Sequence, residues 1–132
     1  MRSLLLIGAD ALSPYRDALQ AEGFSVTLHP PGSDSTPQGD HAVVIIDVAT
    51  AAEDALARQF LQAARSGDAP PIIAILTPQQ LSSLDPEREI DDFILTEAAP
   101  EELLARVRQA VWKRHRVDTR NVLKIGDLVM DL

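Results

Sequence analysis

The chain has 132 residues, of which 45% are apolar, enough for one compact core and too few for two full domains. It carries 20 acidic against 12 basic side chains, so its net charge of −8 repels nucleic-acid phosphates and anionic lipid. There is no cysteine, and the three histidines have no ligand spacing, which excludes disulfides, thiolate metal sites and structural zinc. We expect no cofactor.

The first residues, MRSLLLIG, contain an apolar run far too short to span a membrane and no signal-peptide cleavage site. They predict a strand over 4–7, buried on both faces, in a cytoplasmic protein. A helix over 14–22 follows, with Ser13 as N-cap, Pro14 at its first position and Gly23 just past its end.

Residues 24–28 alternate apolar and polar side chains, which predicts a strand near a sheet edge. The next segment, PPGSDSTPQGD over 30–40, has so many turn residues that a helix there is predicted to be missing or vestigial. The β-branched runs HAVVIID (41–47) and PIIAILT (71–77) predict two central parallel strands, with a helix over 52–64 between them.

The second half continues the alternation of strands and helices. Asp85-Pro86 interrupts residues 78–90 and permits only a short or broken fourth helix. DFIL at 92–95 predicts a fifth strand. Residues 100–115 form the clearest helix, with an apolar stripe, glutamates at its start and basic residues at its end.

This order predicts an α/β fold, a doubly wound, flavodoxin-like sheet of five parallel strands in the order 2-1-3-4-5. Sites in such sheets form at the carboxyl ends of the strands. The residues expected there are Gly8, Ala9, Asp10, Asp47, Thr77, Thr96 and Glu97.

The segments VVIID, IIAILT and DDFILTEAAPEELLARVRQAVWKR resemble a response-regulator receiver domain over residues 1–116, and the last of them resembles the OmpR/PhoB subfamily. In that family an acidic pair after the first strand binds Mg²⁺, an aspartate after the third accepts phosphate, and a hydroxyl and a lysine contact the phosphoryl group. The resemblance makes Asp47 the phosphoacceptor position, and Thr77 and Phe93 the switch positions.

The chain departs from the family pattern at four positions. Gly8 and Ala9 replace the acidic pair, and Thr96 and Glu97 replace the Lys-Pro pair. Phosphoryl transfer depends on a metal and a cation that neutralise the transferring oxygens. We therefore expect an atypical, non-enzymatic receiver without a metal, in which Asp47 serves as a turn or helix-cap acceptor.

Two alternatives remain open. Asp47 could be a working phosphoacceptor for a sensor kinase, with Asp10 or Glu97 recruiting the metal. The chain could also be a flavodoxin-like module that binds a nucleotide or flavin, although no glycine-rich phosphate loop follows the first strand and only 4% of the residues are aromatic.

Charged residues of alternating sign lie on the last strand and helix, as a two-fold contact requires. The resemblance implies a homodimer through this face. The interface residues predicted are Asp91, Asp92, Glu102, Arg106 and Lys113. The main hypothesis is a phosphorylation-independent signal-input domain of a transcriptional regulator that acts by dimerisation or by binding a partner protein.

Residues 121–132 alternate around Gly126-Asp127, as a hairpin would. They resemble the opening strands of a winged-helix DNA-binding domain. We expect 117–132 to be a linker and the first hairpin of such a domain, truncated here, so that DNA binding belongs to a longer protein.

Overall fold

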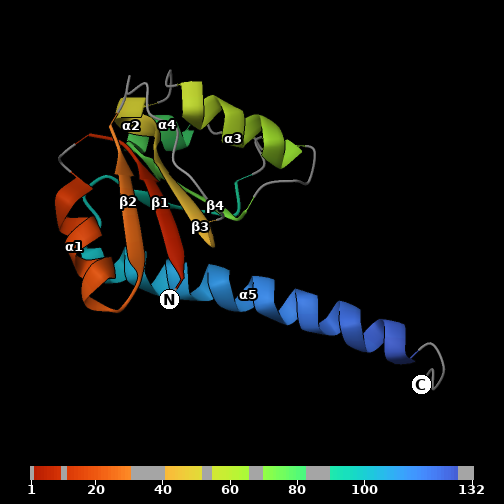
Figure 1. Ribbon diagram of the computed structural model, residues 1–132. Coiled ribbons are helices and arrows are strands. Elements are labelled where there is room, and N and C mark those ends of the chain that lie inside the picture. The colour runs from red at the N-terminus through yellow and green to blue at the C-terminus, as the bar shows by residue number, and fades with distance from the viewer. Residues whose placement is uncertain are drawn as a thin grey trace.

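The computed structural model describes residues 2–9, 12–30, 41–51, 55–65, 70–82 and 90–127. Within them lies one five-stranded sheet in the order β2-β1-β3-β4-β5, with every neighbouring pair parallel, which confirms the predicted topology (Figure 1). The strands are β1 (Ser3–Ile7), β2 (Ser25–His29), β3 (Val43–Asp47), β4 (Ile72–Leu76) and β5 (Asp92–Leu95).

The strand sequences explain their places in the sheet. The central strands β3 and β4 are buried at every residue, as expected of parallel strands covered by helices on both faces. β2 lies at an edge and alternates, with Ser25 and Thr27 exposed and Val26 and Leu28 half-buried. One face of β2 therefore carries exposed polar side chains, as predicted for a strand at the edge of the sheet.

Helices cover the two faces of the sheet (Figure 1). On one face, α1 (Ser13–Ala21) and α5 (Pro100–Asp127) pack Leu19, Leu103 and Val107 against alternate strand residues. On the other face, α3 (Ala55–Arg65) and α4 (Pro78–Ser82) contribute Ala57, Phe60 and Leu81 to a second cluster. The short helix α2 (Val48–Ala51) follows β3 directly.

The ends of α1 differ in how well the sequence predicted them. Gly23 was predicted correctly: its φ is 98°, and the N–H groups of Gly23 and Phe24 donate to the carbonyls of Gln20 and Leu19. The prediction of Ser13 as N-cap was wrong, because α1 begins at Ser13 and Leu12 holds the N-cap position. Leu12 is 3% exposed, so burial of its side chain sets this helix start.

The segments between strands carry the remaining differences. The helix predicted over 52–64 appears as α3, with 52–54 outside the described residues, and α2, which precedes that range, was not predicted. The described part of the fourth helix is five residues long, and 83–89 lie outside the description. The prediction that the helix after β2 is missing falls on 31–40, which also lie outside it.

α5 continues to Asp127 where a linker and a strand were expected over 117–132. A helix satisfies its backbone hydrogen bonds within itself, whereas an isolated two-stranded hairpin is marginal in water without a sheet to join. Residues 128–132 lie outside the described part. Figure 1 shows the C-terminal half of α5 projecting away from the sheet. No helix in the described ranges combines the length and apolarity that crossing a membrane requires.

Candidate functional site

The carboxyl ends of four strands meet at one edge of the sheet, as predicted. The register pairs Ile7 with Ile46, Asp47 with Ile75, and Leu76 with Leu95, so these strands end level with one another. We call this edge the carboxyl edge. It comprises Gly8, Ala9, Asp47, Thr77, Thr96 and Glu97.

Asp47 is buried, with 5% of its surface exposed, and both carboxylate oxygens are engaged. Oδ1 accepts a hydrogen bond from the backbone N–H of Ala49 at 3.2 Å, and Oδ2 accepts one from the hydroxyl of Thr50 at 2.8 Å. Since α2 begins at Val48, Asp47 stands at the N-cap of that helix. Each oxygen of the carboxylate therefore accepts a hydrogen bond from a residue of α2.

Thr77 and Gln80 form a reciprocal capping box at the start of α4. The Thr77 hydroxyl accepts a hydrogen bond from the N–H of Gln80 at 3.1 Å, and the N–H of Thr77 donates to Oε1 of Gln80 at 2.9 Å. Pro78 occupies the first helical position, where a missing N–H costs nothing. The Thr77 hydroxyl is thus held by its own helix. Gln80 also donates from Nε2 to the carbonyl of Val48 at 3.2 Å.

Gly8 has no room for a side chain. A Cβ built there would overlap Cδ1 of Leu12 and lie 2.8 Å from Cβ of Asp47. Leu12 therefore packs into the space beside Asp47, where the resemblance to receiver domains would place a carboxylate for Mg²⁺. Gly8 and Ala9 offer no carboxylate of their own, so these residues do not fit the family's magnesium site. Outside the gaps in the description, no three His, Asp or Glu side chains gather as metal ligands; Asp10 lies in one of those gaps.

Tyr15 of α1 reaches the loop that follows β5. Its hydroxyl donates to the carbonyl of Ala98 at 2.7 Å and lies 3.4 Å from that of Thr96. Burial raises the pKa of the Tyr15 phenol above its ordinary value of 10.0, and the negative charges of Asp47 and Glu102 raise it further. A neutral phenol thus holds the loop in which the resemblance would place the lysine of receiver domains.

A second cluster of charge lies on β5 and α5. Nη1 of Arg106 donates to both carboxylate oxygens of Asp92, at 2.9 and 3.0 Å, and Nη2 lies 3.6 Å from Glu102 one turn away. The hydrogen bond with Asp92 raises the pKa of the Arg106 guanidinium. The Nε–H of Arg106 is buried and has no acceptor among the described residues. One of the N–H donors of this guanidinium is thus unsatisfied within the described part of the chain.

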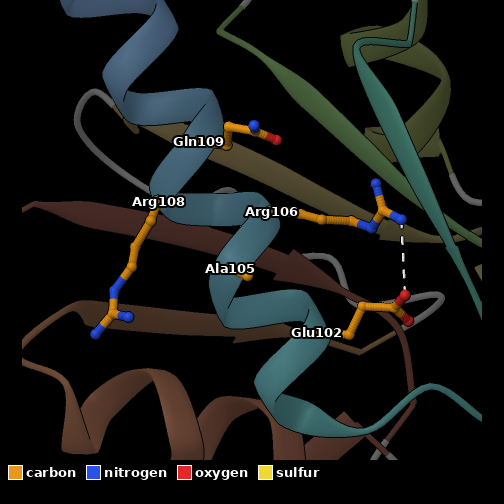
Figure 2. Close-up of a pocket in the computed structure, with 5 residues that line it drawn as sticks. All are labelled: Glu102, Ala105, Arg106, Arg108 and Gln109. Carbon is orange, nitrogen blue, oxygen red and sulfur yellow. Dashed lines mark ion pairs between the residues drawn. The ribbon is translucent and has the colours of Figure 1, made fainter.

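Figure 2 shows Arg106 and Glu102 extending to the same side of α5, whereas Arg108 extends to the other side, where it pairs with Glu22. Between β5 and α5 there is a groove of about 370 Å³. The side chains that line it include Phe93, Leu95, Glu97, Glu102 and Arg106. Leu95 is 37% exposed at its rim.

The predicted interface residues do not all share one cluster. Asp91 accepts a hydrogen bond from the N–H of Ile72 at 2.7 Å, and so helps to join β5 to β4. Lys113 is exposed two turns beyond Arg106 on α5. Phe93 is half-buried and packs against the cluster beneath α3 and α4. We use the name β5–α5 face for Asp92, Leu95, Glu102, Arg106 and Lys113.

Sequence reasoning missed Leu12, Tyr15, Thr50 and Gln80. One of them carried a signal, because Thr77-Pro-Gln-Gln80 is the Thr-x-x-Gln pattern of a capping box. The roles of Leu12 and Tyr15 depend on long-range packing that no local pattern encodes.

Comparisons with known proteins show the same fold. Solved structures of similar fold include a CheY-like receiver domain protein from Methanospirillum hungatei JF-1, with 12% identity, a TM-score of 0.68, and coverage of 88% of this chain and 98% of that one. A structure from a family of streptococcal redox sensors described as evolved from two-component response regulators has 18% identity, a TM-score of 0.73, and coverage of 91% and 55%. An OmpR/PhoB homologue of Thermotoga maritima, DrrB, has 21% identity, a TM-score of 0.67, and coverage of 86% and 54%.

At these identities the structures show the fold alone, and no protein of curated function matches the sequence. The family model described as the N-terminal domain of the transcription regulator GlnR matches residues 1–111. The chain therefore belongs to the family of GlnR N-terminal domains, and its fold is that of a response-regulator receiver domain.

Proposed function

We propose that this chain is a phosphorylation-independent receiver domain, the signal-input part of a longer transcription regulator. One observation carries the proposal: Asp47 is buried as the cap of α2, and Leu12 fills the space beside it where Gly8 has no side chain. In this proposal Asp47, at the phosphoacceptor position, has a structural role as the cap of α2.

The chemistry of phosphoryl transfer supports this reading. The transferring group must be neutralised by a metal and a cation, which supply most of the catalysis. At the carboxyl edge Gly8 and Ala9 offer no metal ligands, and the lysine position is occupied by Thr96. Phosphorylation would also convert one of the two accepting oxygens of the Asp47 carboxylate into an ester oxygen, which is a weaker acceptor, and so would weaken the cap of α2.

We further propose that the domain signals as a homodimer through the β5–α5 face. This face combines charges of both signs, an exposed leucine and a groove, as a self-complementary contact needs. In the longer protein, the dimer would set the spacing of DNA-binding domains that follow this one.

The dimer is tested by analytical ultracentrifugation of wild type and Arg106→Glu. We expect a wild-type dimer without any phosphodonor, and a shift of the variant to monomer, because the variant removes the cation of this face and places a third carboxylate beside Asp92 and Glu102, so that two copies would bring like charges together. Arg108→Glu is the matched control, since it makes the same change on the opposite side of α5 (Figure 2). It should remain a dimer.

Phosphorylation is tested by NMR, with beryllofluoride and Mg²⁺ added to the wild-type chain. The proposal expects no saturable shift at Ala49, Thr50 or Thr77. Saturable, Mg²⁺-dependent shifts at these residues, or a dimer that forms only with a phosphodonor, would restore conventional receiver chemistry and a sensor-kinase partner.

A further inference from the structure

The side chain of Gln80 lies between the two short helices at the carboxyl edge. We infer that Gln80 is a positioning residue that couples the Asp47 cap of α2 to the start of α4, so that the state of the cap is transmitted to α4. The inference rests on the proposed function in one respect: it takes Asp47 as a structural cap.

Both the oxygen and the nitrogen of the Gln80 side-chain amide form hydrogen bonds. Oε1 accepts from the N–H of Thr77 at 2.9 Å, and Nε2 donates to the carbonyl of Val48 at 3.2 Å. Thr77 offers a donor and Val48 an acceptor, so a single orientation of the amide satisfies both. Val48 directly follows Asp47, is 8% exposed and begins α2. Gln80 thus connects the first residue of α2 to the cap of α4.

Neither helix can hold its place alone. α2 has four residues and α4 has five, far below the length at which an isolated helix is stable in water. Each depends on its cap: Asp47 and Thr50 at α2, Thr77 and Gln80 at α4. Because the amide of Gln80 serves both ends, loosening one helix removes a support of the other.

The coupling extends from α4 to β5, which forms part of the proposed dimer face. Leu81 of α4 and Phe93 of β5 pack against the same apolar cluster, and Phe93 also lines the groove beside α5. A change in α4 therefore reaches β5 through packed side chains. In this arrangement the glutamine joins the acceptor position to α4 without a phosphoryl group.

The test is amide hydrogen exchange of the full chain, followed by NMR, without Mg²⁺ or a phosphodonor. Two amides report on the helices: Ala49, whose N–H binds Asp47, and Leu81, whose N–H donates to the Thr77 carbonyl at 3.0 Å. The amide of Ile45, in the central strand β3, reports global unfolding and normalises the rates.

Gln80→Glu separates the two roles of this residue. A carboxylate still accepts from the N–H of Thr77 but cannot donate to the Val48 carbonyl. Loss of that one hydrogen bond should accelerate exchange at Ala49 about fivefold. Gln79→Glu adds the same charge at the adjacent, exposed position of α4 and should leave Ala49 unchanged.

Asp47→Ala then tests transmission. In the wild-type background it should accelerate exchange at Leu81 about fivefold, and in the Gln80→Glu background it should add little, because the connection is already cut. Equal acceleration in both backgrounds, or an Ala49 rate in Gln80→Glu that matches Gln79→Glu, would overturn the inference. If phosphoryl-type chemistry were found at Asp47, the proposed function would fail while these rates, measured without donor, still decided the coupling.

Discussion

At the scale of single residues, Asp47 stabilises the start of α2. Asp47 binds the N–H of Ala49 and the hydroxyl of Thr50. Replacing an N-cap carboxylate by alanine costs about 0.5–2 kcal/mol, and burial places this cap toward the upper end. We therefore expect Asp47→Ala to lower the free energy of unfolding by about 2 kcal/mol in urea titrations.

Two further substitutions sharpen that prediction. Thr50→Val removes only the hydroxyl that donates to Oδ2, so its loss of stability should be smaller than that of Asp47→Ala. Asp47→Glu should lose stability without changing the sedimentation of the chain, since the longer side chain misplaces the cap and does not imitate a phosphoryl group. An Asp47→Ala protein as stable as wild type would show that the cap contributes nothing.

Tyr15 yields a prediction on pH. It is the only tyrosine in the chain, so tyrosinate absorbance reports on it alone. Its pKa in the folded state is raised, which means that it keeps its proton where the unfolded chain has lost it. The stability contributed by Tyr15 is thus full below a pH of about 10 and is lost as the pH rises through the folded pKa.

The measurement pairs wild type with Tyr15→Phe. Tyrosinate should form in the native protein only above the pH at which it forms in urea. Between a pH of about 10 and the folded pKa, the free energy of unfolding should fall more steeply for wild type than for the variant. Native and denatured titration curves that coincide would contradict the burial of this phenol.

The sequence predicted where these residues lie better than what they do. Asp47 and Thr77 could be placed at strand ends because β-branched runs mark buried parallel strands and a parallel sheet aligns their carboxyl ends. That Tyr15 reaches Ala98 could not be predicted, because the two lie 83 residues apart and no local pattern encodes that distance. The position of Leu12 beside Asp47 could not be predicted either, since it depends on how α1 docks against the sheet.

At the scale of elements, the junction of β1 with α1 is fixed by one close contact. Gly8→Ala would place a methyl group on Leu12 and Asp47, and overpacking of this kind costs about 1–3 kcal/mol. Leu12→Ala removes the nearer of the two obstructing groups, while Cβ of Asp47 stays 2.8 Å away, so in that background Gly8→Ala should cost less without becoming neutral. A double-mutant cycle of unfolding free energies measures this coupling.

Gly23 provides the control for that cycle. A Cβ there would meet nothing within 4 Å, but the φ of 98° strains any other residue by about 1–2 kcal/mol. The cost of Gly23→Ala should therefore be the same with or without Leu12. Additivity of Gly8→Ala and Leu12→Ala would show that the two side chains do not compete for one space.

The elements also show where periodicity succeeds and fails. The alternation of β2 identified an edge strand because polar side chains face outward there. The alternation of 121–132 suggested strands in the same way, but α5 continues through most of this segment. Alternation of apolar and polar residues specifies a strand only where the segment can pair with the edge of a sheet.

At the scale of the whole molecule, α5 performs two different tasks along its length. Its first turns close the core, with Leu103 and Val107 fully buried and Ala110 nearly so. Beyond them the helix projects away from the sheet (Figure 1). A helical segment that projects from a domain is marginal in water at such lengths, so we expect this part of α5 to add little to the stability of the domain.

We therefore expect a chain that ends at Arg116 to unfold with the same free energy as the full chain, within about 0.5 kcal/mol. Among the side chains that the structure describes, the core residues of α5 precede that point, and the sheet keeps both of its helical layers. Urea unfolding measures the free energy, and circular dichroism should show a loss of helix signal confined to the removed segment. Sedimentation of the shortened chain separates the roles of the two halves: if the β5–α5 face alone holds the dimer, its dissociation constant is unchanged. A large loss of stability on shortening would instead mean that the projecting half of α5 packs against a second copy of the chain.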